Sequence, residues 1–229
     1  MDLLGQPSGR GLQADLEDIC LQFGSGRGRV SKLPKVDLLP GWDCYDWRNA
    51  RTILQYGHPS EWSDIIEVLT ASRLPHSAIA AKGGSKTELA TAIDSEFYKR
   101  GWLEKKFETK IVVDKVESES PTHKVDCFKG KIALEVEWNN KDPFYDRDLN
   151  NFRLLYDLRV ADVGVVVTRS TELQQWLHRH RVEFGRDSST FGGSTTHYDK
   201  LEPRILGGGA GGCPLLIFAM TPTIYIDDR

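Results

Sequence analysis

The run from Ile132 to Trp138 constrains the fold of this chain more than any other stretch. Its apolar residues occupy every second position, and the positions between them hold Ala133, Glu135 and Glu137. Alternate side chains of a β-strand point to opposite faces of a sheet. The run therefore predicts a strand with one apolar face and with two glutamates side by side on the other face.

A third carboxylate precedes this run by one short turn. Asp126 comes before the lysine- and glycine-rich turn of residues 128–131, so we expect a hairpin that brings Asp126, at the end of the preceding strand, beside Glu135 and Glu137. Three carboxylates on one patch repel each other, and a hard divalent cation such as Mg²⁺ would remove that repulsion. The pattern predicts either a metal-assisted hydrolase or a hairpin whose glutamate face is solvated, and it does not choose between them.

Length, composition and net charge limit the class of protein to which this chain can belong. The chain has 229 residues, of which 39% are hydrophobic and 28% charged, as in a soluble globular protein with a sizeable core. Its formal net charge of −3 does not indicate a nucleic-acid-binding protein. It does not exclude one either, because binding depends on a local basic surface and not on the net charge of the whole chain. We expect no membrane segment and no secretory leader. Four cysteines without metal-ligand spacing predict reduced, buried thiols in a cytoplasmic protein.

The remaining pattern predicts a weakly ordered N-terminal segment, residues 1–40, followed by one domain over residues 41–229. The near-continuous apolar run Asp162–Thr168 predicts a strand that is buried on both faces. Helical spacing predicts four helices, over residues 59–69, 88–100, 146–158 and 173–182. Ser60 is expected to cap the first of them. The chain should therefore be α/β, with a mixed central sheet flanked by helices.

A small basic glycine turn, residues 82–89, leads into the second of these helices. Ser85 and Lys86 lie in this turn, and the free amides of a helix N-terminus beside lysines suit a phosphate. The same sequence also suits an ordinary helix cap, and the glycine spacing is not that of a Walker loop. Glu88 lies in the first helical turn, where a carboxylate favours the helix dipole even without a catalytic role.

Several local strings follow one another in a suggestive order. They are Gly83–Lys86, Glu96–Lys99, Val125–Asp126 with Glu135–Glu137, and Asn139–Asn140 followed by Asp148–Phe152. Together they resemble the PD-(D/E)xK nuclease core, and in particular the BglII/BstYI-like type II restriction endonucleases, over residues 47–170. The resemblance implies a homodimer that cuts palindromic double-stranded DNA with Mg²⁺ at a GATC-type centre. It leaves open whether a cognate DNA methyltransferase is a partner.

The resemblance also implies catalytic roles. Asp126 and Glu135 match the family's metal ligands, whereas Glu137 stands at a position where lysine is usual. This departure puts the usual role of the lysine in doubt, and Glu137 would act as a general base, orient the attacking water or help to hold the metal. Glu88 corresponds to a helix carboxylate that many members of the superfamily carry.

The candidate DNA-binding residues are Asn140, Asn139, Ser85 and Lys86. Asn140 matches a position that reads bases in BglII-like enzymes, and an asparagine amide can pair with adenine through two hydrogen bonds. The alternative is an asparagine that forms a turn.

Two other functions fit parts of the pattern. A glycosidase also uses two carboxylates, but they come from separate elements around a sugar cleft, whereas Glu135 and Glu137 share one strand. A catalytically silent DNA-binding module, derived from a nuclease, is the second alternative, although the intact carboxylate set argues against decay. We therefore expect a type II restriction endonuclease that hydrolyses phosphodiester bonds at a short palindromic site.

Overall fold

The computed structural model describes residues 32–81, 88–119, 122–187 and 190–229. The chain divides into two compact units, Met1–Ser31 and Lys32–Arg229, and the described residues all belong to the second. Most of the predicted N-terminal segment therefore lies outside the described residues. Within the described ranges, no helix has the length and apolar character needed to cross a membrane.

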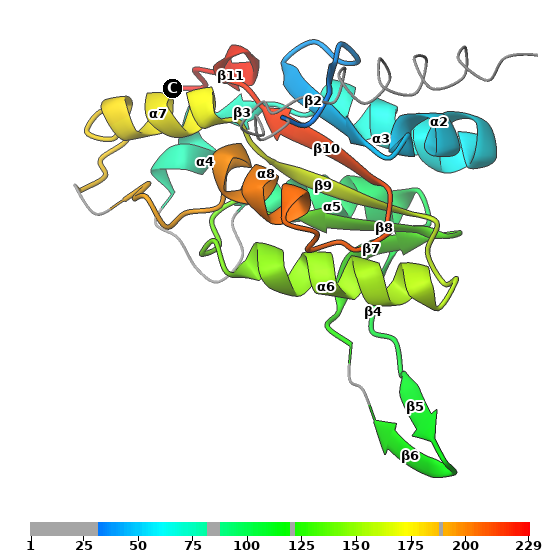
Figure 1. The fold of residues 1–229 in the computed structure, drawn as a ribbon. Coiled ribbons are helices and arrows are strands. Elements are labelled where there is room, and N and C mark those ends of the chain that lie inside the picture. Colours follow the sequence, from blue (N-terminus) through cyan, green and yellow to red (C-terminus); the bar gives the residue numbers. More distant parts are fainter. Residues whose placement is uncertain (1–31, 82–87, 120–121, 188–189) are drawn as a thin grey trace, which may run out of the picture. The chain divides into compact units, whose positions relative to one another are not determined.

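The described residues build a seven-stranded mixed sheet (Figure 1). Its strands, in order across the sheet, are β1 (Lys35–Val36), β2 (Trp42–Trp47), β10 (Leu215–Met220), β9 (Val163–Arg169), β8 (Ile132–Val136), β7 (Val125–Lys129) and β4 (Leu103–Lys105). Strands β8, β9 and β10 run parallel, whereas β2 and β7 run antiparallel to their neighbours. This arrangement confirms the predicted α/β fold with a mixed sheet.

Helices cover both faces of this sheet, which is why the central strands are apolar on both sides. One hydrophobic cluster joins Leu134 of β8 to residues of α3 (Pro59–Ala71), α5 (Glu88–Lys99) and α7 (Thr171–His180). The other joins Ala133 of β8 to residues of α6 (Phe144–Asp157) and α8 (Tyr198–Leu206). Every residue of β9 is buried, as predicted for the apolar run that contains it.

Two small sheets are separate from the seven-stranded sheet. Strands β5 (Lys110–Val113) and β6 (Val116–Glu119) form an antiparallel hairpin, and β3 (Leu74–Pro75) pairs in parallel with β11 (Tyr225–Ile226). The shorter helical segments are α2 (Ala50–Thr52), the π-helical turn η1 (Ile53–Gly57), α4 (His76–Ala80) and the 3₁₀ turn η2 (Pro222–Ile224). Cys44, Cys127 and Cys213 are buried free thiols, as predicted, and Cys20 lies outside the described residues.

Helix α3 begins where the sequence predicted, but its cap is different. Its N-cap is His58 and Pro59 opens the helix, so the prediction that Ser60 caps it is wrong. Proline suits the first helical position because the N–H that it lacks would have no partner in the helix. Helix α7 does have a side-chain cap, because Ser170 Oγ accepts a hydrogen bond of 3.0 Å from the amide of Leu173.

Gly164 of β9 lets helix α6 approach the sheet closely. A Cβ added at this position would lie 2.7 Å from Cδ2 of Leu215 and 2.9 Å from the ring of Phe152 in α6. Both distances are too short for real atoms, so a larger residue would displace one neighbour or the other. Since Asp148 lies about one helical turn before Phe152, the same contact sets how near Asp148 comes to the sheet.

Candidate active site

Asp126 and Glu135 meet across the hairpin of β7 and β8. The strand register pairs Cys127 with Leu134, and continuing it by one residue places Asp126 opposite Glu135. At this point the carboxylates replace the backbone acceptors. The amide of Val136 donates to Oδ2 of Asp126 at 3.1 Å, and the amide of Asp126 donates to Oε2 of Glu135 at 3.2 Å. The two predicted metal ligands are thus brought together.

Asp126 is the second residue of β7, and the prediction that it ends its strand is wrong. The strand continues to Lys129, and the turn consists of Gly130 and Lys131. The pairing of β4 with β7 shifts its register between Leu103 and Lys105, so Asp126 lies in a bulged stretch. A bulge bends a strand and re-aims its side chains, which is a common device beside active sites.

Glu137 continues β8 on the same side as Glu135. Its amide donates to the carbonyl oxygen of Val167 at 2.8 Å, which extends the pairing with β9 by one residue. Each of the two glutamates is only 1% exposed. The interpretation of a solvated glutamate face is therefore wrong, because α6 packs on the face that Ala133 shares with them.

A fourth carboxylate, Asp148 of α6, joins the cluster, and sequence analysis did not select it. Asp148 is 1% exposed, and its Oδ1 accepts a hydrogen bond of 2.9 Å from Nε of Arg147. After burial, its negative charge is the largest cause of the raised pKa of Glu137. A signal was present in the sequence, because Asp148 falls on the buried helical stripe of Tyr145 and Leu149.

The carboxylate of Glu137 is held from several sides. Nδ2 of Asn140 donates to its Oε2 at 2.8 Å, and Nη2 of Arg147 lies 3.5 Å from its Oε1. The predicted base-reading asparagine therefore contacts the predicted catalytic glutamate. The contacts with Asn140 and Arg147 orient the Glu137 carboxylate in the cluster.

Burial dominates the protonation of these groups. Burial, with the negative charges of Asp148 and Asp126, raises the pKa of Glu135 well above its ordinary value. Burial and the charge of Asp148 raise the pKa of Glu137 to about 9, although the hydrogen bond from Asn140 acts in the opposite direction. Burial raises the pKa of Asp148 as well. With a pKa of about 9, Glu137 retains its proton at neutral pH until a positive charge compensates the neighbouring carboxylates.

The donor set suits a hard divalent cation. Oε1 of Glu135 and Oδ2 of Asp148 are buried and accept no hydrogen bond from a described residue. In the part of the chain that the structure describes, no three His, Cys, Asp or Glu side chains form an arrangement ready to hold a metal ion. Carboxylate oxygens whose pKa is raised by burial still fit this chemistry, because metal binding releases their protons.

The remaining predicted site residues, Glu88, Ser85 and Lys86, are not part of the described carboxylate cluster. Glu88 is the exposed first residue of α5, and it forms no hydrogen bond or ion pair with the cluster among the described residues. The same helix does reach β7, because the hydroxyl of Tyr98 donates to the carbonyl oxygen of Asp126 at 3.1 Å. Ser85 and Lys86 lie outside the described residues.

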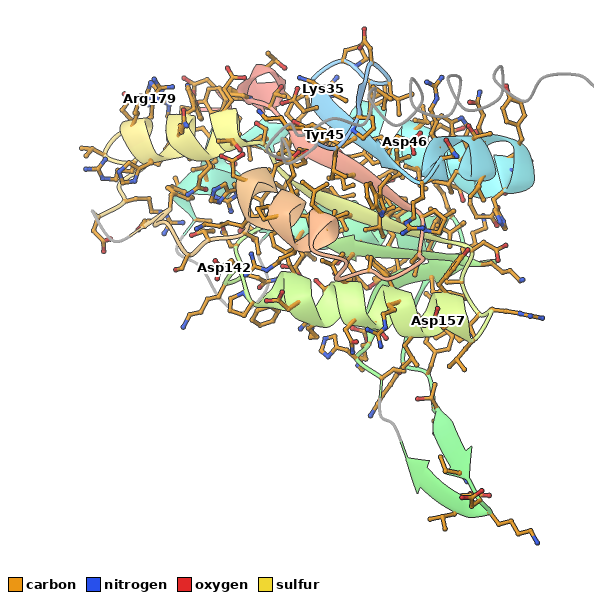
Figure 2. The ribbon with its side chains drawn as sticks, viewed as in Figure 1. Lys35, Tyr45, Asp46, Asp142, Asp157 and Arg179 are labelled. Atoms are coloured by element: carbon orange, nitrogen blue, oxygen red, sulfur yellow. The ribbon has the colours of Figure 1, made fainter. Side chains whose placement is uncertain are left out.

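The segment that follows Glu137 is held on a second side by a distant loop. The amide of Thr196 donates to the carbonyl oxygen of Asn140 at 2.9 Å, and the amide of Asp142 donates to that of Ser194 at 2.8 Å. Figure 2 shows Asp142 at the end of α6 that faces α8, with Asp157 at the opposite end of α6. The chain between the cluster and α6 is therefore ordered by residues more than fifty positions away in sequence.

Arg169, the last residue of β9, is fully buried beside the same segment. Its guanidinium donates to the carbonyl oxygen of Trp138, to Oδ1 of Asn139 and to Oε1 of Gln174, the last at 3.0 Å. Burial lowers its pKa to about 9. Gln174 also lines a cleft of about 430 Å³ between α7 and the segment that begins at Phe191. Arg169 was not among the site residues predicted from the sequence.

Comparison with known families identifies the chain. A family model described as "Restriction endonuclease BglII/BglIII" matches residues 42–220, from the first residue of β2 to the last of β10. With the mixed sheet and the helices on its two faces, this match defines a type II site-specific deoxyribonuclease. The chain belongs to the BglII/BglIII restriction endonuclease family. The match extends beyond the sequence strings to cover residues 171–220 as well, and no curated protein matches the chain.

Proposed function

We propose that this restriction endonuclease hydrolyses phosphodiester bonds of double-stranded DNA at a short palindromic site, with Mg²⁺ as its cofactor. The observation that carries the proposal is the carboxylate cluster of Asp126, Glu135, Glu137 and Asp148. Burial and neighbouring negative charge raise the pKa of Glu135, Glu137 and Asp148, and a divalent cation would allow these carboxylates to be ionised together.

Three residues of the cluster have proposed roles. Asp126 and Glu135 would hold the cation, which would supply positive charge beside the scissile phosphate and acidify a water molecule when bound. Asn140 and Arg147 orient Glu137, which supports a role of its carboxylate in accepting a proton from the attacking water. Glu88 is proposed as a further catalytic residue, and it lies on helix α5, which contacts β7.

DNA recognition is proposed for the segment that follows the cluster. Asn139 and Asn140 leave β8 together, and the amide group of Asn140 has a second N–H besides the one that it donates to Glu137. A base that engaged Asn140 would therefore act on the same side chain that orients Glu137, which would couple recognition to hydrolysis. Ser85 and Lys86 are proposed as phosphate contacts.

A palindromic site has two-fold symmetry, and a symmetric dimer would match it with one cluster on each strand. We therefore propose a homodimer in which each subunit cuts one strand. The catalytic domain would span residues 41–229 and follow the N-terminal segment of residues 1–40. A cognate DNA methyltransferase would protect the host DNA.

Digestion of mixed plasmid and phage DNA tests the proposal directly. Purified protein is incubated first with Mg²⁺ and then with Mg²⁺ and excess EDTA. We expect discrete bands that disappear in EDTA, and sequencing of the ends gives the site. A smear would contradict sequence specificity, and cutting that persists in EDTA would contradict the metal requirement. A protein that shifts DNA on a gel but never cuts it would be the silent binding module.

A further inference from the structure

Arg169 is a buried cation that has no acidic partner among the described residues. Its side chain has no exposed surface, and no carboxylate among the described residues lies within ion-pair distance of it. Burying an unpaired charge is costly, and an apolar side chain of similar size would serve packing better. Its presence at the end of β9 is therefore poorly explained by stability alone.

The bonds of the guanidinium show what this cation does. Two of them go to consecutive residues, the carbonyl oxygen of Trp138 and Oδ1 of Asn139, and a third goes to Oε1 of Gln174. The ring of Trp138 lies 4.5 Å from the guanidinium carbon, and the ring of Phe191 lies 5.7 Å away. The guanidinium is therefore held by three hydrogen bonds and lies over two aromatic rings.

The contacts of Arg169 continue into helix α7. Gln174, which accepts from Arg169, donates in turn to the carbonyl oxygens of Phe191 at 2.8 Å and Gly192 at 3.3 Å. A continuous polar bridge thus runs from Asn139, through Arg169 and Gln174, to the loop beside the cleft.

We infer that Arg169 is a positioning residue for DNA recognition, which fixes the Trp138–Asn140 segment against helix α7. The inference rests on the proposed function, because it assigns base contacts to that segment. The role needs arginine rather than any cation. A lysine ammonium is a single point charge on a flexible stem, and it lacks the planar fork that reaches Asn139 and Gln174 at once.

The test compares Arg169→Lys with wild type on two short duplexes. One contains the site mapped from the wild-type digest, and the other carries one changed base pair in that site. The readout is the ratio of kcat/KM for the two duplexes, which a merely structural loss would leave unchanged. We expect this ratio to fall about 10-fold or more in Arg169→Lys, since one good base contact supplies discrimination of that order.

Arg73→Lys is the matched control, because Arg73 also donates to main-chain carbonyl oxygens, those of Thr70 and Ser72, on another part of the molecule. It should keep the wild-type ratio. Should Arg169→Lys fail to fold, Gln174→Met removes the other end of the bridge while Arg169 stays. The ratio should then fall in Gln174→Met.

The outcomes separate the inference from the proposed function. A wild-type ratio in Arg169→Lys, or in Gln174→Met where only that variant folds, would overturn the inference and leave the endonuclease proposal intact. A wild-type protein that cuts no DNA would overturn both. A reduced ratio with a wild-type melting temperature would support the positioning role.

Discussion

Glu135 is the residue at which burial and charge conflict most directly. One of its oxygens accepts from the amide of Asp126, and the other is buried without a described partner. A glutamine of the same shape would avoid the charge, so the carboxylate is best explained by chemistry that needs an anion. Its strand position followed from the alternation with Val136, but its burial did not, because alternation does not reveal what covers a face.

We expect Glu135→Gln to lower the cleavage rate by about 10²–10³-fold or more, because it removes a charge that acts at the reacting phosphate. The fold and DNA binding should persist, since the replacement is isosteric. Plasmid cleavage and gel-shift assays measure the two effects. Glu172→Gln, at the exposed start of α7, is the control and should cut at the wild-type rate. Rapid cleavage by Glu135→Gln would remove this residue from the site.

The raised pKa of Glu137 predicts how the free energy of unfolding depends on pH. Its pKa rises from an ordinary 4.5 to about 9 in the folded protein, so between these values the folded chain holds a proton that the unfolded chain releases. The free energy of unfolding should therefore fall as pH rises, by about 1.4 kcal/mol per pH unit for one proton. Urea unfolding in EDTA at pH 6, 7 and 8 measures this slope.

The control for that slope is Glu137→Gln, which has no proton to release and should flatten it. Equal slopes in the variant and in wild type would show that Glu137 is not the group responsible. Glu135 and Asp148 also have raised pKa values and should leave a smaller residual slope in the variant.

A serine at the start of a helical pattern does not always cap the helix, as α3 and α7 show. Ser60 and Ser170 both precede helical patterns, yet only Ser170 accepts a hydrogen bond from a helix amide. We expect Ser170→Ala to reduce the free energy of unfolding by about 1 kcal/mol, and Ser60→Ala to leave it nearly unchanged. Chemical denaturation of both variants measures the difference. A larger loss in Ser60→Ala would mean that the cap lies where the sequence first suggested.

The elements that could be identified from the sequence have strong apolar patterns, such as the continuous apolar run of β9 and the helical spacing of α5. Two others escaped identification for physical reasons. Strand β2 has only two buried residues, and its place depends on six paired positions along β10. Helix α8 contains Pro203 and follows a loop rich in serine, threonine and glycine. Both owe their structure to tertiary contacts, which outweigh local propensity.

The same reason explains which parts of the site remained hidden. The hairpin that joins Asp126 to Glu135 is local, so its spacing could be read from the chain. Asp148 enters the cluster only because α6 docks on the sheet, and Arg169 reaches Asn139 only because β8 and β9 are neighbours. Contacts between distant segments are set by the fold, and a single sequence carries no direct record of them.

At the scale of the whole molecule, the proposed dimer predicts a distinctive mixed product. A heterodimer of one wild-type and one Glu135→Gln subunit, isolated through two different tags, should cut one strand and accumulate nicked circular plasmid. The wild-type homodimer should give linear plasmid under the same conditions. Gel electrophoresis separates the two forms. Linear product from the heterodimer would mean that a single subunit cuts both strands.

The size of the residue at position 164 affects the active site although Gly164 is not part of it. The missing methyl group at this position determines how deeply α6 settles on the sheet, and α6 carries both Asp148 and Arg147. A mutational library confined to the carboxylates and the asparagines would change individual side chains, while the position of α6 on the sheet stayed the same. Diversifying Gly164 together with Phe152 would instead move a whole layer of the site as one body, and would open geometries that no substitution within the site can reach.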